Sequence, residues 1–139
     1  MTLAVSRGLE ADDCCYFAPE KLVVADEAIM RWSKNVADYP NPDLAIEVDL
    51  SPSKIDRAAI YAALRVAEVW RFDGEQKIVA IDRLGEDGTY HTVEESRFLP
   101  VNSNEIGRWA LDEDRRAGSA WARRLREWAR AKLAPRLGR

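Results

Sequence analysis

The segment NPDLAIEVDLSPSK (Asn41 to Lys54) constrains the fold of this chain most, because it reads as a strand with acids on one face. Alternation with a period of two indicates a β-strand whose successive side chains point to opposite sides of a sheet. One face consists of Leu44, Ile46, Val48 and Leu50, and the other of Asp43, Ala45, Glu47 and Asp49. We therefore predict a strand over residues 43–50 with one face in the core and one acidic face.

Two interpretations of the acidic face follow from the residues alone. In the first, the carboxylates face water from a half-exposed antiparallel strand. In the second they share a cation, because acids are poor strand formers and same-face neighbours about 7 Å apart repel one another. Mg²⁺ binds carboxylate oxygens, and a neighbouring strand lies only about 4.8 Å away. Asp12 or Asp13, at the start of an earlier predicted strand, is then a candidate to meet Glu47 at one ion.

The rest of the chain predicts an α+β domain. Short β-rich runs indicate strands, and Asp87-Gly88 is a hairpin signal between the last two of them. A helix capped by Ser51 or Ser53 is expected between the second and third strands. The predicted strands lie at 11–17, 43–50, 68–73, 76–84 and 90–95, and the other predicted helices at 19–35, 102–116 and 119–133. The expected fold is a mixed sheet flanked by helices, with a C-terminal helical part at 103–133.

Composition indicates a globular protein. The 139 residues, 47% hydrophobic and 32% charged, fit one domain spanning 1–139. No apolar run approaches the roughly 20 residues that cross a bilayer, and the N-terminus lacks a secretory signal pattern, so we expect a cytoplasmic protein. Cys14 and Cys15 are adjacent and would point to opposite faces of a strand, so we expect reduced thiols. The sequence contains no Gly-rich phosphate loop, Ser-His-Asp pattern or Cys/His cluster, which argues in turn against a nucleotide cofactor, a triad hydrolase and a zinc site. His91 is expected to be structural.

The charge is distributed unevenly. From Arg115 to the end the chain has nine basic residues and one acid, Glu127, although the whole chain has a net charge of −3. A basic C-terminal helix is compatible with contacts to a DNA backbone and equally with a solvated face. Tryptophans at helical spacing, Trp121 and Trp128, together with Trp109, are expected to pack in the core or in a dimer rather than to stack on bases.

Three stretches together resemble the Uma-type putative restriction endonuclease family, a bacterial branch of the PD-(D/E)XK nuclease superfamily. PDLAIEVDLSPSKIDRAAIYAALRVAEVWRFDG (42–74) is similar to the family's strand, helix and strand motifs. GLEADDCCYF (8–17) is similar to its earlier strand, and SRFLP (96–100) to the segment before its C-terminal helices. The resemblance implies a restriction-endonuclease-like core, Mg²⁺-dependent cleavage of DNA and frequent homodimers. It also implies a longer N-terminal segment than this chain has. We therefore expect either a minimal version of the fold or a shortened one whose exposed sheet edge is covered by a partner.

The resemblance also implies the site residues. Carried over by position, the metal ligands are Asp12 and Glu47, with the backbone carbonyl of Val48 as a third. Mg²⁺ is the implied cofactor, and Mn²⁺ is a substitute for it. The superfamily's lysine position falls on Asp49, which departs from the pattern.

The basic role then passes to another residue. In the family a helix lysine four residues before a tyrosine is the migrated replacement, and counting back from Tyr61 gives Arg57, with Lys54 as a second candidate. Arginine stays charged, so it can orient water or neutralise phosphate charge but cannot act as a base at neutral pH. Two functions therefore remain open: a metal-dependent endonuclease, and a catalytically inactive nuclease-fold protein that dimerises or binds a partner.

Overall fold

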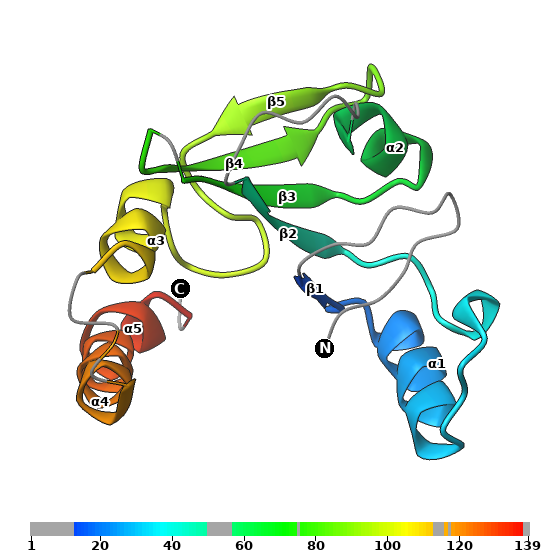
Figure 1. The fold of residues 1–139 in the computed structure, drawn as a ribbon, viewed down its shortest axis with the longest axis horizontal. Helices are drawn as coiled ribbons and strands as arrows, with labels where there is room; N and C mark the ends of the chain where they lie inside the picture. The colour runs from blue at the N-terminus through cyan, green and yellow to red at the C-terminus, as the bar shows by residue number, and fades with distance from the viewer. Residues whose placement is uncertain (1–12, 50–56, 75, 113–115, 117, 138–139) are drawn as a thin grey trace.

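The computed structural model describes residues 13–49, 57–74, 76–112, 116 and 118–137 (Figure 1). Among these residues the strands are β1 (Asp13–Cys15), β2 (Leu44–Asp49), β3 (Glu68–Asp73), β4 (Ile78–Leu84) and β5 (Tyr90–Val93). The helices are α1 (Pro19–Met30), α2 (Arg57–Ala63), α3 (Ser103–Ala110), α4 (Gly118–Trp128) and α5 (Ala134–Leu137), with a 3₁₀ turn η1 (Val36–Asp38) and a π-helical turn η3 (Ala129–Leu133). The predicted α+β class is confirmed.

The five strands form one mixed sheet in the order β1-β2-β3-β4-β5. Among the strands that the structure describes, β2 and β3 run parallel, and the other neighbouring pairs are antiparallel. Parallel neighbours need a crossover connection, and α2 lies in the segment that joins these two strands. The predicted bounds of β3 agree with the structure at both ends.

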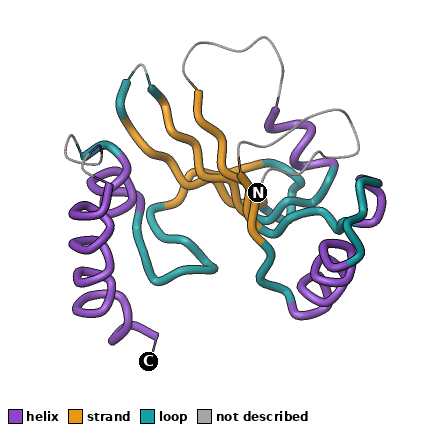
Figure 2. The backbone as a smooth tube through the Cα atoms, turned by 60° about the horizontal axis from the view of Figure 1, so that its bottom comes forward, coloured by secondary structure: helices purple, strands orange, loops and turns teal. Residues whose placement is uncertain are grey.

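Helices cover both faces of the sheet (Figure 2). On one face Tyr61 and Leu64, from α2 and the turn after it, pack on Ala45 and Val69. On the other face Trp70 belongs to a second cluster, which also holds Leu44, Ile81 and Val101 and is packed by Ile106 of α3, Trp128 of α4 and Leu133 of η3. The core is therefore split into two layers by the sheet.

The prediction of one core face and one solvated or acidic face for β2 is wrong in its burial pattern. Ala45 and Glu47, on the face expected to be acidic, are 0% and 2% exposed, whereas Val48, on the expected core face, is 44% exposed. The reason is that β2 lies between β1 and β3 and is covered by helices on both sides. Strands buried on both faces lose the in–out alternation of hydrophobicity.

Helix α2 follows from its sequence, RAAIYAA, because alanine has the highest helix propensity. The helix ends where Arg65 adopts a left-handed conformation (φ 60°) and Val66 N–H donates to the Tyr61 carbonyl. A left-handed residue followed by such a hydrogen bond is a common C-terminal capping motif of helices. The serines expected to cap the helix, Ser51 and Ser53, lie outside the described residues.

Helix α1 begins at Pro19, as predicted, but ends at Met30 rather than near Asn35. Its cap residue, Ala18, has no capping side chain. Instead the Asp43 carboxylate, which precedes β2, accepts hydrogen bonds from the backbone N–H groups of Phe17 (2.7 Å) and Ala18 (2.8 Å). A distant acid thus satisfies donors at the start of the helix.

The C-terminal helices also differ in detail from the prediction. Helix α3 begins with a capping box, in which Asn102 and Glu105 each accept a hydrogen bond from the other's backbone N–H. Helix α4, the π-helical turn and α5 follow one another directly from Gly118 to Leu137, further than the predicted end at 133. No helix within the described ranges has the length and apolar character to cross a membrane.

The predicted hairpin between β4 and β5 is confirmed. Gly85 N–H donates to the Thr89 carbonyl at 2.8 Å, and Gly88 has a φ of 79°, which suits glycine. His91 lies beside this turn, where its Nε2 is 3.0 Å from an Asp87 carboxylate oxygen. The expected structural role of His91 is consistent with this position.

Candidate functional site

Glu47 is a buried acid on a central strand. It lies on β2, is 2% exposed, and pairs in register with Arg71 of the parallel strand β3. The Tyr61 hydroxyl of α2 donates a hydrogen bond to Glu47 Oε1. A carboxylate so far from water requires donors or a cation, since burying an isolated charge is very costly.

A small cavity adjoins Glu47. Its volume is about 50 Å³, and its lining residues are Glu47, Ala58, Tyr61, Val69, Arg71, Asp82 and Tyr90. A space of this size accommodates a water molecule or a small ion. The cavity lies under α2, so residues from two strands, a helix and the hairpin converge on it.

The Arg71–Asp82 ion pair also lines the cavity. Arg71 Nε donates to Asp82 Oδ2 at 2.5 Å, and the Thr92 hydroxyl donates to Asp82 Oδ1 at 2.8 Å. The Tyr90 hydroxyl donates to the Val66 carbonyl at 2.6 Å, and burial, followed by the charge of Asp82, raises the pKa of Tyr90. Tyr90 therefore remains protonated at neutral pH. The Asp82 carboxylate is paired with the Arg71 guanidinium.

The structure places only some of the predicted site residues. Glu47 is buried at the cavity, and Val48 follows it on β2 with a half-exposed side chain. The backbone of Arg57 forms the first residue of α2, one turn before Tyr61. Asp12 and Lys54 lie outside the described residues, as do the side chains of Arg57 and Asp49.

Sequence reasoning gave no role to several residues that line the cavity: Tyr61, Arg71, Asp82 and Tyr90. One signal was present, because Arg71 and Asp82 interrupt the apolar runs EVWRFD and IVAIDRL. The Asp82 side chain is largely buried, and its carboxylate pairs with the partly exposed Arg71.

Two further buried acids have structural partners. Glu68, with 0% exposure, accepts hydrogen bonds from Trp70 Nε1, the Ser96 hydroxyl and the Arg97 N–H at 2.6–2.9 Å. Burial acts to raise the pKa of Asp43, but hydrogen bonds from Ala18 and Phe17 and the nearby Lys21 outweigh it and lower that pKa. The acids at 43 and 47 therefore do not form one row facing water or a single ion.

The oxygen donors around Glu47 suit a hard cation in part. Glu47 offers the carboxylate oxygens that Mg²⁺ prefers, but Asp82 is already engaged by Arg71 and Thr92. Within the part of the chain that the structure describes, no group of three or more His, Cys, Asp or Glu is placed to hold a metal ion. Strand β1 pairs with β2 so that Asp13 lies opposite Ile46, the residue before Glu47.

Comparison with known proteins agrees with this arrangement of elements. Searches of the curated proteins and of the solved structures gave no match. A family model described as "Uma2: Putative restriction endonuclease" matches residues 4–111, which include all five strands, α1, α2 and α3. The mixed sheet with its flanking helices is consistent with a restriction-endonuclease-like fold, and the chain belongs to the Uma2 family of putative restriction endonucleases.

Proposed function

We propose that this protein is a Mg²⁺-dependent endonuclease that hydrolyses phosphodiester bonds in DNA. The observation that carries the proposal is the buried Glu47 carboxylate, which lies on a central strand at a small cavity and is hydrogen-bonded by Tyr61. Membership of a family of nuclease type supports it. Asp12 and Glu47 would hold the ion, with the Val48 carbonyl as a further ligand.

The bound ion would polarise the scissile phosphate and lower the pKa of a coordinated water. The chain's own residues would prepare the site. The Tyr61 hydroxyl fixes the orientation of the Glu47 carboxylate, and α2 covers it from water on one side. Fixed ligands of this kind avoid reorganisation during the reaction.

Arg57 is the proposed phosphate-binding residue. It lies four residues before Tyr61 on α2, and residues four apart lie on the same face of a helix. Its permanent charge would neutralise charge that develops on the phosphate, but it would not accept a proton at neutral pH. Lys54 is the alternative for a basic role that includes proton transfer.

Glu47→Gln tests the proposal, since the substitution keeps the side-chain volume and removes the charge. We expect nicking of supercoiled plasmid in millimolar Mg²⁺ or Mn²⁺ to fall by at least about 100-fold, because even residues that only support metal ligands contribute 10- to 100-fold. Glu86→Gln, at the exposed hairpin turn, is the matched control and should cut like the parent. Equal activity of the Glu47→Gln variant and the parent would refute the assignment.

A second candidate function is a partner-binding protein without catalysis. It is favoured by Asp49 at the position of the superfamily lysine, and by a large apolar groove on the other face of the sheet. Ligand binding raises the stability of the folded state. A parent protein that cuts no DNA, and whose melting temperature does not change in millimolar Mg²⁺ or Mn²⁺, would establish this candidate over the nuclease.

A further inference from the structure

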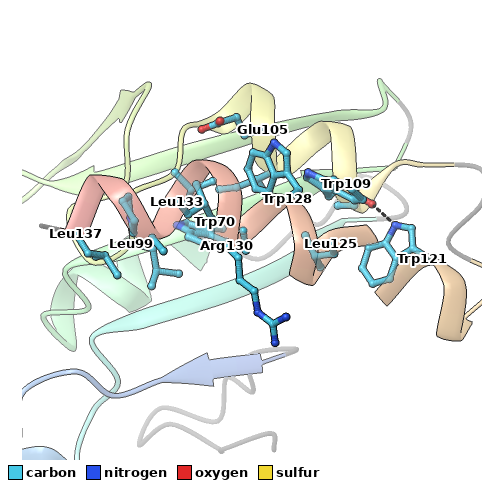
Figure 3. A pocket seen from close by; sticks show the side chains of 16 residues that line it. Trp70, Leu99, Glu105, Trp109, Trp121, Leu125, Trp128, Arg130, Leu133 and Leu137 are labelled. Atoms are coloured by element: carbon cyan, nitrogen blue, oxygen red, sulfur yellow. Dashed lines mark hydrogen bonds between the residues drawn. The ribbon is translucent and has the colours of Figure 1, made fainter. Parts of the chain in front are cut away.

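An open apolar groove lies among the C-terminal helices, on the face of the sheet opposite Glu47 (Figure 3). Its volume is about 610 Å³. Its lining includes Trp109, Trp121, Leu125, Trp128, Leu133 and Leu137. Large exposed apolar surfaces on soluble proteins commonly mark interaction sites.

The tryptophans of the groove contact one another. Trp109 contacts Trp121 and Trp128 with ring centroids 6.3 and 5.6 Å apart, and the Trp121 Nε1–H donates to the Trp109 carbonyl. Its charged lining residues in the described part of the chain are Glu105 and Arg130. Glu105 is paired with Arg136, whereas the Arg130 side chain extends away from the tryptophans (Figure 3).

Helix α1 exposes the apolar side chains that a surface helix normally buries. Its buried residues are the small Ala25 and Ala28, whereas Val23 is 57% exposed and Met30 is 80% exposed. Leu22, Val24, Ile29 and the following Trp32 are also exposed. Surface helices usually turn their larger apolar residues to the core. This arrangement therefore indicates a surface that another protein chain covers.

Helix α1 and the helical segment that bounds the groove are opposite in charge, and the groove segment is the longer of the two. Helix α1 carries three acids, Glu20, Asp26 and Glu27, against one lysine, which pairs with Asp43. The helical segment that bounds the groove, 118–133, carries five basic residues against one acid, and one of the five, Arg130, lines the groove itself. The 12 residues of α1 form a helix about 18 Å long. The helical segment from Gly118 to Leu137, with 20 residues, is longer than α1.

Helix α1 and the groove are at opposite ends of the molecule in both views (Figures 1 and 2). We infer that the protein forms a homodimer in which α1 of each copy lies in the tryptophan groove of the other copy. Reciprocal exchange makes two equivalent contacts and closes the assembly at two chains. This inference does not depend on phosphodiester cleavage, and its test uses neither metal nor DNA.

Sedimentation of the full chain tests the inference with two sets of substitutions. Val23→Lys with Met30→Lys alters the exposed face of α1, and Leu99→Glu with Leu137→Glu places acids at exposed groove residues, where they would repel the acidic α1. Ile78→Lys, at an exposed apolar residue of β4, is the control. We expect a dimeric parent and control, and a dissociation constant at least about 30-fold weaker for each double variant, as for the loss of interface hot spots.

Mixing the two double variants separates this geometry from others. The α1 variant keeps an intact groove and the groove variant keeps an intact α1, so the equimolar mixture should form a heterodimer through one contact. A mixture that stays monomeric would show that α1 does not lie in the groove. A monomeric parent, or an α1 variant as dimeric as the parent, would overturn the inference outright.

Discussion

Individual buried acids in this protein are stabilised by different means. Glu68 is surrounded by three neutral donors, Asp43 by two backbone N–H groups and a lysine, and Glu47 by a tyrosine hydroxyl. Hydrogen bonds to a charged group contribute more than those between neutral groups. Removing one of these acids therefore affects stability according to the donors that it leaves behind.

Glu68→Gln is expected to lower the free energy of unfolding by about 2 kcal/mol, because the amide retains one acceptor oxygen for donors that used two. Urea denaturation followed by tryptophan fluorescence measures this change. Glu86→Gln, at an exposed position, should change stability by less than about 0.5 kcal/mol. A loss for Glu68→Gln no greater than that of the control would mean that the three donors find other partners.

Asp43 gives stability a dependence on pH. Its pKa in the folded state is lowered, so it stabilises the fold above its unfolded pKa, and this contribution is lost as the pH falls through the folded value. We expect Asp43→Asn to be less stable than the parent near neutral pH and the gap to shrink below about pH 4. Urea denaturation at several pH values measures it, and a gap that does not change with pH would contradict the charge of Asp43 as its cause.

At the scale of elements, α3 connects the C-terminal helices to the sheet. Gly107 of α3 lies against Val79 of β4, and Glu105 closes the capping box with Asn102. The same carboxylate accepts two hydrogen bonds from Arg136 of α5, at 2.9 and 3.0 Å. Arg136 also donates to the Pro100 carbonyl, so one guanidinium joins α5 to the start of α3.

Asn102→Ala is expected to cost about 1 kcal/mol of stability through the lost cap. Arg136→Gln should cost less than the loss of the cap, because the ion pair is partly exposed to solvent. Glu105→Ala removes both interactions and should cost more than either, measured by urea denaturation. A Glu105→Ala protein no less stable than Asn102→Ala would show that Arg136 adds nothing.

At the scale of the whole molecule, charge is separated between the C-terminal helices and the rest of the chain. Arg123 and Arg126 are exposed on α4, the helix whose Trp128 packs against the core cluster. Such arginines are either solvated or available to phosphates, and only the second role gives binding that weakens steeply with salt.

Replacing Arg123 and Arg126 by Gln is expected to reduce the slope of log binding constant against log salt by about 2 for duplex DNA without metal, if each arginine contacts one phosphate. Fluorescence anisotropy with a labelled duplex measures the slope. Lys34→Gln with Arg65→Gln removes the same charge at exposed sites elsewhere and should leave the slope unchanged. Equal slopes for the two variants would assign the α4 arginines to a solvated face.

Local signals predicted much of the fold. The bounds of β3, the Asp87-Gly88 hairpin and the proline start of α1 depend on residues close in sequence, and the structure confirms them. The acid Glu47 was singled out by its place in a strand, and it lies at the candidate site. The Arg71–Asp82 pair was missed because it joins neighbouring strands, and register is set by pairing rather than by either sequence segment.

By itself the sequence determined the order and type of most elements, since periodicity, turn residues and helix propensity act over a few neighbouring residues. Only the tertiary structure decided which acids are buried and what holds them. Burial depends on which elements cover a strand, and β2 is covered on both faces. The acids predicted for one face of this strand therefore take different roles: Asp43, just before β2, accepts hydrogen bonds from backbone N–H groups at the start of α1, whereas Glu47 is a buried carboxylate.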